Sequence, residues 1–85
     1  MDDVKTEPKV VLWYRDGCPF CDKALAWINQ YVPSAEKNKI LSMQEKMDFY
    51  NKHNVRTLPQ IYVDDVHIGG WTDLYNSDFR KSLES

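Results

Sequence analysis

The chain has 85 residues, which is enough for one small domain with one modest hydrophobic core. Its 11 basic and 13 acidic residues give a formal net charge of −2, without the positive excess on which nucleic-acid binding rests. No apolar run approaches the roughly 20 residues that cross a bilayer, and residues 1–8 are too polar for a secretory signal. We therefore expect a cytoplasmic protein that binds neither nucleic acid nor a membrane.

The first half of the chain predicts a strand followed by a helix. Residues 1–8 are expected to form a flexible charged tail, and residues 9–85 a single domain. The apolar run 10–14 is typical of a strand buried on both faces. Pro19 stands where a helix takes a first-turn proline, and the helix should end at Pro33 and Ser34. Its apolar face is expected to contain Ala24, Trp27, Ile28 and Tyr31.

The middle of the chain predicts a weak strand and a second helix. Residues 39–42 could form a short edge strand, although the polar residues around them weaken this assignment. Ser42 and Glu45 resemble a capping box that opens a helix ending near Asn54. Its apolar stripe is expected to be Met43, Met47 and Tyr50, with the methionines in the core.

The last third predicts a β-hairpin and a final helix. Two alternating runs, 58–63 and 66–70, flank the pair Asp64 and Asp65, which we interpret as the turn of the hairpin. Thr72 or Asp73 can cap one last helix with apolar residues Leu74, Tyr75, Phe79 and Leu83. The order β-α-β-α-β-β-α indicates a single α/β domain.

The only two cysteines, Cys18 and Cys21, are poor candidates for a structural role. A disulfide between them would close a loop of about four residues, which stabilises a fold by roughly 2 kcal/mol before any strain. Structural zinc needs four ligands, and only His53 and His67 could complete a set, at spacings that fit no zinc finger. We therefore expect no metal site and place both histidines on the surface.

A Cys-x-x-Cys motif between a strand and a helix predicts a dithiol redox site. Cys18 would lie at the helix N-terminus, where the macrodipole and the N–H groups of Phe20 and Cys21 favour a thiolate. We expect the Cys18 thiol to titrate below neutrality and that of Cys21, one turn deeper, not to. Cys18 would then attack a disulfide sulfur, and Cys21 would resolve the mixed disulfide.

Three segments in order resemble the glutaredoxin family, in its dithiol class. They are Cys-Pro-Phe-Cys at 18–21, Arg-Thr-Leu-Pro-Gln-Ile-Tyr-Val at 56–63, and His-Ile-Gly-Gly-Trp-Thr-Asp-Leu at 67–74. The resemblance covers nearly the whole chain. It implies a thioredoxin-like fold, with a four-stranded mixed sheet of order 2-1-3-4 flanked by three helices.

The resemblance also implies glutathione as a co-substrate. A cis Pro59 would leave the backbone of Thr57 and Leu58 free to pair with the cysteinyl part of glutathione. Thr72 and Asp73 would hold the γ-glutamyl end, since a helix N-terminus suits a carboxylate and an aspartate suits an ammonium. The glycyl carboxylate would meet Arg15, with Lys46 as a weaker candidate, and the ring of Phe20 would lie near the ligand.

Two departures from the family pattern stand in these segments. Phe20 replaces the usual Tyr and so loses a hydroxyl near the ligand. Trp71 and Thr72 replace a smaller pair, and the Trp could narrow the pocket or join a protein-docking face.

The implied function is glutathione-dependent thiol–disulfide oxidoreduction. A monomer would reduce glutathione mixed disulfides and protein disulfides through Cys18 and Cys21, without a metal. Two alternatives remain open. One is an iron–sulfur carrier in which two subunits share a cluster through Cys18 and glutathione. The other is a dedicated hydrogen donor to ribonucleotide reductase. In that case thioredoxin reductase, and not glutathione, would reduce this protein.

Overall fold

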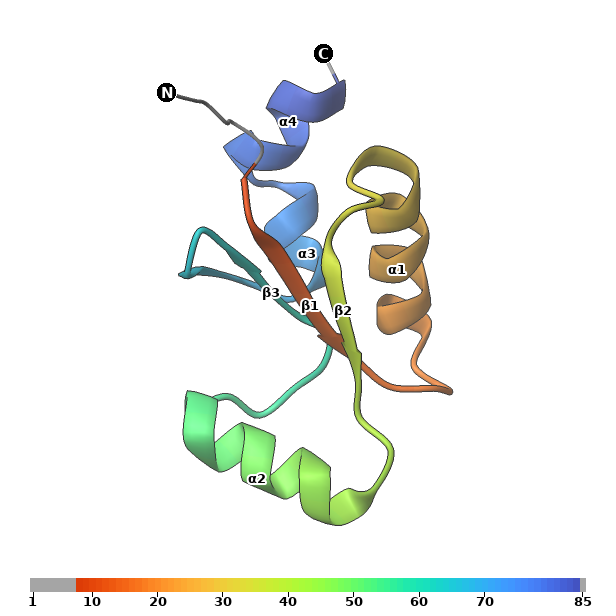
Figure 1. Ribbon diagram of the computed structural model, residues 1–85, viewed down its shortest axis with the longest axis vertical. Coiled ribbons are helices and arrows are strands. Elements are labelled where there is room, and N and C mark those ends of the chain that lie inside the picture. Colours follow the sequence, from red (N-terminus) through yellow and green to blue (C-terminus); the bar gives the residue numbers. More distant parts are fainter. Residues whose placement is uncertain (1–7, 85) are drawn as a thin grey trace.

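The computed structural model describes residues 8–84, and its centre is a four-stranded mixed sheet of order β2-β1-β3-β4 (Figure 1). Central strand β1 (Val10–Tyr14) pairs in parallel with β2 (Glu36–Lys39) and antiparallel with β3 (Gln60–Val63). Strand β4 (Val66–Gly69) completes the sheet antiparallel to β3. The predicted strand order is confirmed. The expected tail at 1–8 lies, apart from Pro8, outside the described residues.

Helices α1 (Pro19–Tyr31) and α3 (Trp71–Tyr75) contact the sheet and each other. The main hydrophobic core lies between them and the sheet, where its most buried side chains come from β1, α1, β3 and α3: Leu12, Ile28, Ile61 and Leu74. The predicted apolar face of α1 is confirmed, since Ala24, Trp27 and Ile28 are buried. None of the helices within residues 8–84 is long and apolar enough to span a bilayer.

The β-hairpin is formed as predicted. Asp64 and Asp65 both have positive φ, 51° and 67°, which the tight turn between β3 and β4 requires. Asp64 Oδ1 also accepts a hydrogen bond from the Lys9 N–H at 2.9 Å. The aspartate pair is therefore a turn, and its position holds the start of β1 against the hairpin.

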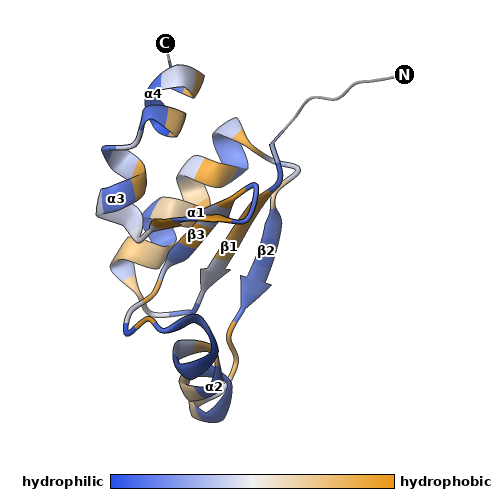
Figure 2. Cartoon of the chain, turned by 90° about the vertical axis from the view of Figure 1, so that its left-hand side faces the viewer, coloured by the Kyte–Doolittle hydropathy of each residue, from blue (hydrophilic) through white to orange (hydrophobic). Residues whose placement is uncertain are grey.

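The second strand was predicted too late in the chain. Strand β2 runs from Glu36 to Lys39, whereas the apolar residues Ile40 and Leu41 follow its end. Figure 2 shows β2 as a hydrophilic edge beside the more apolar β1. Backbone pairing with β1 defines this edge, because Val11 faces Glu36 and the parallel register continues from there. A prediction from side-chain hydrophobicity therefore placed this strand too late in the chain.

Helix α2 (Met43–His53) has the predicted ends, but of the predicted apolar stripe only Tyr50 packs inward. The Ser42 Oγ accepts a hydrogen bond from the Glu45 N–H at 3.1 Å, and Asn54 adopts a left-handed conformation after the last turn. The buried residue of the helix is Phe49, however, while Met43 and Met47 are 66% and 45% exposed. The prediction that the methionines lie in the core is wrong for these two. The helix lies beyond the end of the sheet toward which β1 and β2 run (Figures 1 and 2).

The last helix was predicted as one and is divided in two, which makes four helices within the described residues: α1, α2, α3 and α4 (Asp78–Glu84). The break follows from Ser77, whose Oγ accepts from the Arg80 N–H at 3.1 Å and donates to the Leu74 carbonyl at 2.6 Å. Helix α3 begins after Gly70, so neither Thr72 nor Asp73 occupies its N-cap position. Asp73 lies in the first turn instead.

Candidate functional site

Cys18 is the N-cap residue of α1, where the sequence predicted it. Its backbone is extended, with φ −118° and ψ 110°, and its Sγ accepts a hydrogen bond from the Cys21 N–H at 3.2 Å. Pro19, in the first turn, has no N–H to offer, so the available donors start with the residues after it. The Cys18 thiol also donates to the Leu58 carbonyl across 3.6 Å. The side chain is only 6% exposed, so α1 and residue 58 hold the sulfur from two sides.

Cys21 is fully buried one turn along α1, and both cysteines are free thiols. Burial is the main cause that raises the pKa of the Cys21 thiol from 9.0 to about 12, and its hydrogen bond with Cys18 adds to the effect. A backbone hydrogen bond and the charge of Arg15 act in the opposite direction. At neutral pH Cys21 is therefore a protonated thiol in contact with Cys18. This agrees with the expectation that the Cys21 thiol does not titrate below neutrality.

A cavity of about 370 Å³ lies between the start of α1, the segment before β3 and the start of α3. Neither cysteine lines it, but Leu58, which contacts Cys18, does. Six of the eight residues predicted to bind glutathione line it: Phe20, Thr57, Leu58, Pro59, Thr72 and Asp73. The Leu58–Pro59 peptide bond is cis, as the resemblance implied. Phe20 is 53% exposed at the cavity wall. Segments far apart in sequence thus meet at one place.

The carboxylate of Asp73 is fixed at the edge of this cavity. Its Oδ2 accepts a hydrogen bond from the Gly70 N–H at 3.1 Å, across the first turn of α3. Gly69 allows this close approach, because its φ is +121° and a Cβ there would lie 2.3 Å from Asp73 Oδ2. Gly69 therefore leaves room for the aspartate that the resemblance assigned to the γ-glutamyl end, and Gly70 supplies the N–H that holds it.

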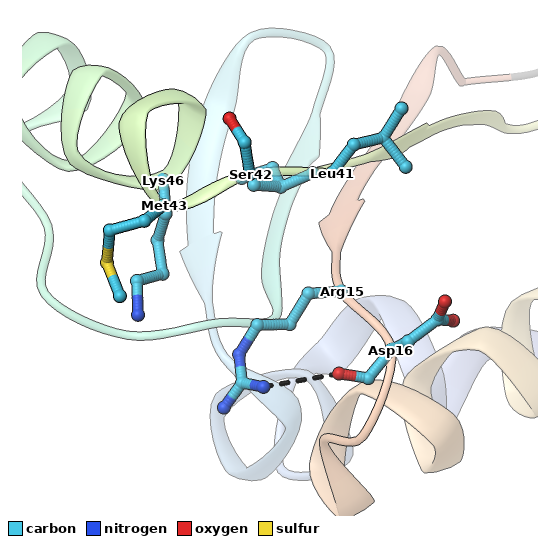
Figure 3. A pocket seen from close by; sticks show the side chains of 7 residues that line it. Arg15, Asp16, Leu41, Ser42, Met43 and Lys46 are labelled. Carbon is cyan, nitrogen blue, oxygen red and sulfur yellow. Dashed lines mark hydrogen bonds between the residues drawn. The ribbon is translucent and has the colours of Figure 1, made fainter.

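Arg15 and Lys46 line a different cavity, of about 260 Å³, between the loop after β1 and the start of α2. Figure 3 shows the two cations approaching it from different elements. Arg15 Nη1 donates to the Asp16 carbonyl at 3.2 Å, and Lys46 Nζ lies 6.0 Å from the centre of the Tyr50 ring. The structure thus brings these two predicted residues together but does not place them in the cavity with Asp73.

Two side chains of the larger cavity were missed by sequence reasoning, namely Gln60 and His67. The hairpin register contained a signal for them, since strand alternation puts Gln60 and Tyr62 on one face of β3, and His67 pairs with Tyr62. The expectation that both histidines lie on the surface holds for His67. It is wrong for His53, which is half-buried against Phe49 with ring centroids 4.4 Å apart.

The described residues contain no group of three or more His, Cys, Asp or Glu side chains able to hold a metal ion together. The cysteines and histidines that might have formed such a group lie apart. His67 hydrogen-bonds to Gln60 and His53 to Tyr62, whereas the Cys18 sulfur hydrogen-bonds to the Cys21 N–H and to the Leu58 carbonyl. Between residues 8 and 84, both histidines therefore hydrogen-bond to side chains of β3, whereas the thiols lie at the start of α1.

Comparison with known proteins gives a consistent result. The glutaredoxin family model matches residues 10–68. Glutaredoxin 3 of Escherichia coli K12 is 34% identical over 76 residues, covering 88% of this chain and 92% of the relative. Glutaredoxin 1 of Rickettsia prowazekii is 33% identical over 78 residues, covering 88% and 82%.

Solved structures agree with this result. The crystal structure of glutaredoxin 1 from Francisella tularensis, complexed with cacodylate, is similar with a TM-score of 0.77 at 30% identity, covering 93% of this chain and 100% of that one. The solution structure of a glutaredoxin from Brucella melitensis has a TM-score of 0.62, also at 30% identity, covering 89% and 84%. With a capping cysteine at α1, a buried partner thiol and this fold, the chain belongs to the glutaredoxin family, which has a thioredoxin-like fold and a thiol–disulfide oxidoreductase role.

Proposed function

We propose that this protein is a glutathione-dependent thiol–disulfide oxidoreductase, with Cys18 as the nucleophile and Cys21 as the resolving thiol. One observation carries the proposal: Cys18 Sγ contacts the Leu58 carbonyl, and Leu58 itself lines the cavity that the predicted glutathione residues share. A ligand in that cavity would present its sulfur beside the cysteine at the helix N-terminus. The family uses glutathione as a co-substrate, which supports the same ligand here.

The bound tripeptide would use three parts of the protein. Its γ-glutamyl ammonium would pair with Asp73, whose carboxylate is already fixed at the cavity edge. Its cysteinyl part would pair with the backbone of Thr57 and Leu58, as an added strand pairs with a sheet edge. Its glycyl carboxylate would extend toward Arg15 and Lys46, the cations of the neighbouring cavity. Phe20, Pro59 and Thr72 would supply the walls between these points.

In the monothiol route, the Cys18 thiolate attacks the glutathione sulfur of a mixed disulfide. The attack forms a Cys18–glutathione disulfide and releases the substrate as a thiolate, which takes up a proton. A second glutathione, as its thiolate, then attacks the glutathione sulfur in that disulfide and frees Cys18. The products are one reduced substrate thiol and one oxidised glutathione: the S–S bond of the mixed disulfide is exchanged for that of oxidised glutathione, and the second glutathione is the reductant.

In the dithiol route, Cys18 opens a protein disulfide and forms a mixed disulfide with one of its sulfurs. Cys21 loses its proton, attacks Cys18 Sγ and releases the second substrate thiolate. The protein is left with a Cys18–Cys21 disulfide, which two glutathione molecules reduce. The raised pKa of Cys21 supports this division of roles, because a protonated Cys21 does not compete for the first attack.

The experiment that tests the proposal is turnover of a glutathionylated peptide with reduced glutathione. Cys18→Ser should abolish it, whereas Cys21→Ser should keep it and lose only the reduction of a protein disulfide. Ser77→Ala, at the junction of α3 and α4, is a control for a substitution outside the site. A Cys18→Ser variant with full turnover would overturn the assignment of the nucleophile.

We further propose that residues 9–85 act as one domain and as a monomer in the cytoplasm. The single-domain part is supported by one four-stranded sheet with two core clusters, the second of which contains both Cys18 and Cys21. Sedimentation equilibrium of the reduced protein, with and without glutathione, should give the mass of one chain. A dimer formed only with glutathione and iron would favour the cluster carrier instead.

A further inference from the structure

We infer that Gln60 and His67 position the Thr57–Leu58 peptide for glutathione, an inference that rests on the function proposed above. The side chain of Gln60 is only 4% exposed, although it begins a strand at the cavity. Its Nε2 donates to the Thr57 carbonyl at 2.9 Å and to Thr57 Oγ1 at 3.1 Å. A buried amide with this arrangement holds the residue that begins the glutathione-facing backbone.

The direction of these hydrogen bonds follows from the chemistry of the groups. A backbone carbonyl only accepts, so the atom of the Gln60 amide that faces Thr57 is the nitrogen. Its Oε1 therefore faces His67 Nε2, 2.5 Å away. An amide oxygen also only accepts, so His67 carries a hydrogen on Nε2. Donation thus runs from His67 to Gln60 and from Gln60 to Thr57, with the imidazole either neutral or charged.

The imidazole of His67 is itself held in place. It stacks on the ring of Tyr62, its cross-strand partner, with ring centroids 4.9 Å apart and an angle of 28°. The Tyr62 hydroxyl lies 3.0 Å from His53 Nδ1, which connects the stack to α2. Because these rings are already fixed, the hydrogen bond between His67 and Gln60 costs less side-chain conformational entropy than it would with a freely rotating imidazole. His67 is nevertheless exposed, so it can be substituted without opening the core.

The consequence for the ligand comes from the planar peptide bond. In a trans peptide the carbonyl and the following N–H point in opposite directions, so holding the Thr57 carbonyl also fixes the direction of the Leu58 N–H. Within residues 8–84 that N–H makes no hydrogen bond, while the Leu58 carbonyl accepts from the Cys18 thiol. Leu58 therefore carries the free N–H donor and also the carbonyl that contacts the nucleophile, Cys18. Gln60 and His67 are positioning residues for that donor.

The test compares His67→Leu with His67→Gln in the turnover of a glutathionylated peptide by reduced glutathione. Leu removes the donor to Gln60, whereas Gln restores an amide N–H at a similar reach. We expect His67→Leu to raise the KM for the peptide about fivefold to tenfold, as the loss of one ordered hydrogen bond would, with kcat within about twofold. His67→Gln should recover most of the KM. Val66→Ala, the exposed neighbour, is the matched control.

Two further measurements separate positioning from a general structural effect. The rate at which iodoacetamide alkylates Cys18 needs no glutathione recognition and should stay within about twofold in His67→Leu. The side-chain amide of Gln60 should exchange its hydrogens faster in His67→Leu than in the unsubstituted protein. An unchanged KM in His67→Leu, or equal losses in the Leu and Gln variants, would overturn the inference.

Failure of the proposed function would look different. The unsubstituted protein would then not turn over the glutathionylated peptide at all. The hydrogen-bond chain could still be judged from the Gln60 amide, because its exchange does not depend on a substrate. Equal exchange in the unsubstituted protein and in His67→Leu would overturn the inference in that case too.

Discussion

The buried thiol of Cys21 should make the fold less stable in alkali. Its pKa is raised from 9.0 to about 12, first by burial and then by its contact with Cys18. Above pH 9.0 the unfolded chain loses this proton while the folded chain keeps it. Because the folded state then binds more protons, the free energy of unfolding falls as the pH rises. The contribution is complete below pH 9.0 and is lost progressively toward the folded pKa.

The size of the effect follows from the linkage relation. Each pH unit inside this window lowers the free energy of unfolding by about 1.4 kcal/mol for one proton. At about pH 10 the loss is therefore about 1.4 kcal/mol, and at about pH 8 it is about 0.1 kcal/mol. The value at pH 10 depends little on the folded pKa, as long as that pKa stays well above the pH of the measurement.

The assay is urea unfolding of Cys18→Ser and of Cys18→Ser/Cys21→Ala at about pH 8 and about pH 10. Cys18→Ser removes the second thiol, and the lysines and tyrosines are the same in both variants. The cavity left by Cys21→Ala affects both pH values equally, so it cancels in the comparison. The free energy of unfolding of Cys18→Ser exceeds that of the double variant by a margin that should shrink by about 1.4 kcal/mol at the higher pH. A change below about 0.5 kcal/mol would show that burial does not hold the Cys21 proton.

Two local substitutions, together with a glycine control, test how the site and α2 are held. Gly69→Ala should destabilise the fold by more than about 2 kcal/mol and raise the KM for a glutathionylated peptide, because its Cβ would displace the Asp73 carboxylate. Gly17→Ala, with φ +73° and open space around it, should cost only about 1 kcal/mol in urea unfolding; equal losses would contradict the clash. Ser42→Ala removes the acceptor of the Glu45 N–H and should cost about 1 kcal/mol, whereas unchanged stability would contradict the cap.

The dithiol segment was predictable because its signals are local. An apolar strand, a turn and a first-turn proline place Cys18 at the start of α1, and the structure confirms that it is the N-cap residue. The turn at Asp64 and Asp65 was equally local, since alternation on both sides specified the hairpin. In each case the residues that define the feature lie within a few positions of one another.

The prediction for α2 was wrong because several apolar residues could have faced the core. Met43, Met47 and Tyr50 form a stripe at helical spacing, yet Phe49 is the buried residue of the helix. Its ring lies 4.7 Å from that of Trp13 on β1, a contact between residues 36 positions apart. Helical periodicity cannot choose between overlapping stripes, whereas packing against a particular partner can.

The sequence by itself determined the order of elements up to the last helix, the membership of a dithiol class and the placement of Cys18, because these depend on short-range spacing and turn chemistry. Only the tertiary structure decided which segments meet. It brought residues 57–59 and 69–73 to one cavity, placed Arg15 and Lys46 at another, and joined His67 to Thr57 through Gln60. The physical reason is that side chains distant in sequence become neighbours through strand pairing and packing. The two cysteines marked in the sequence where chemistry could occur, and the fold supplies the surroundings in which a ligand could be held.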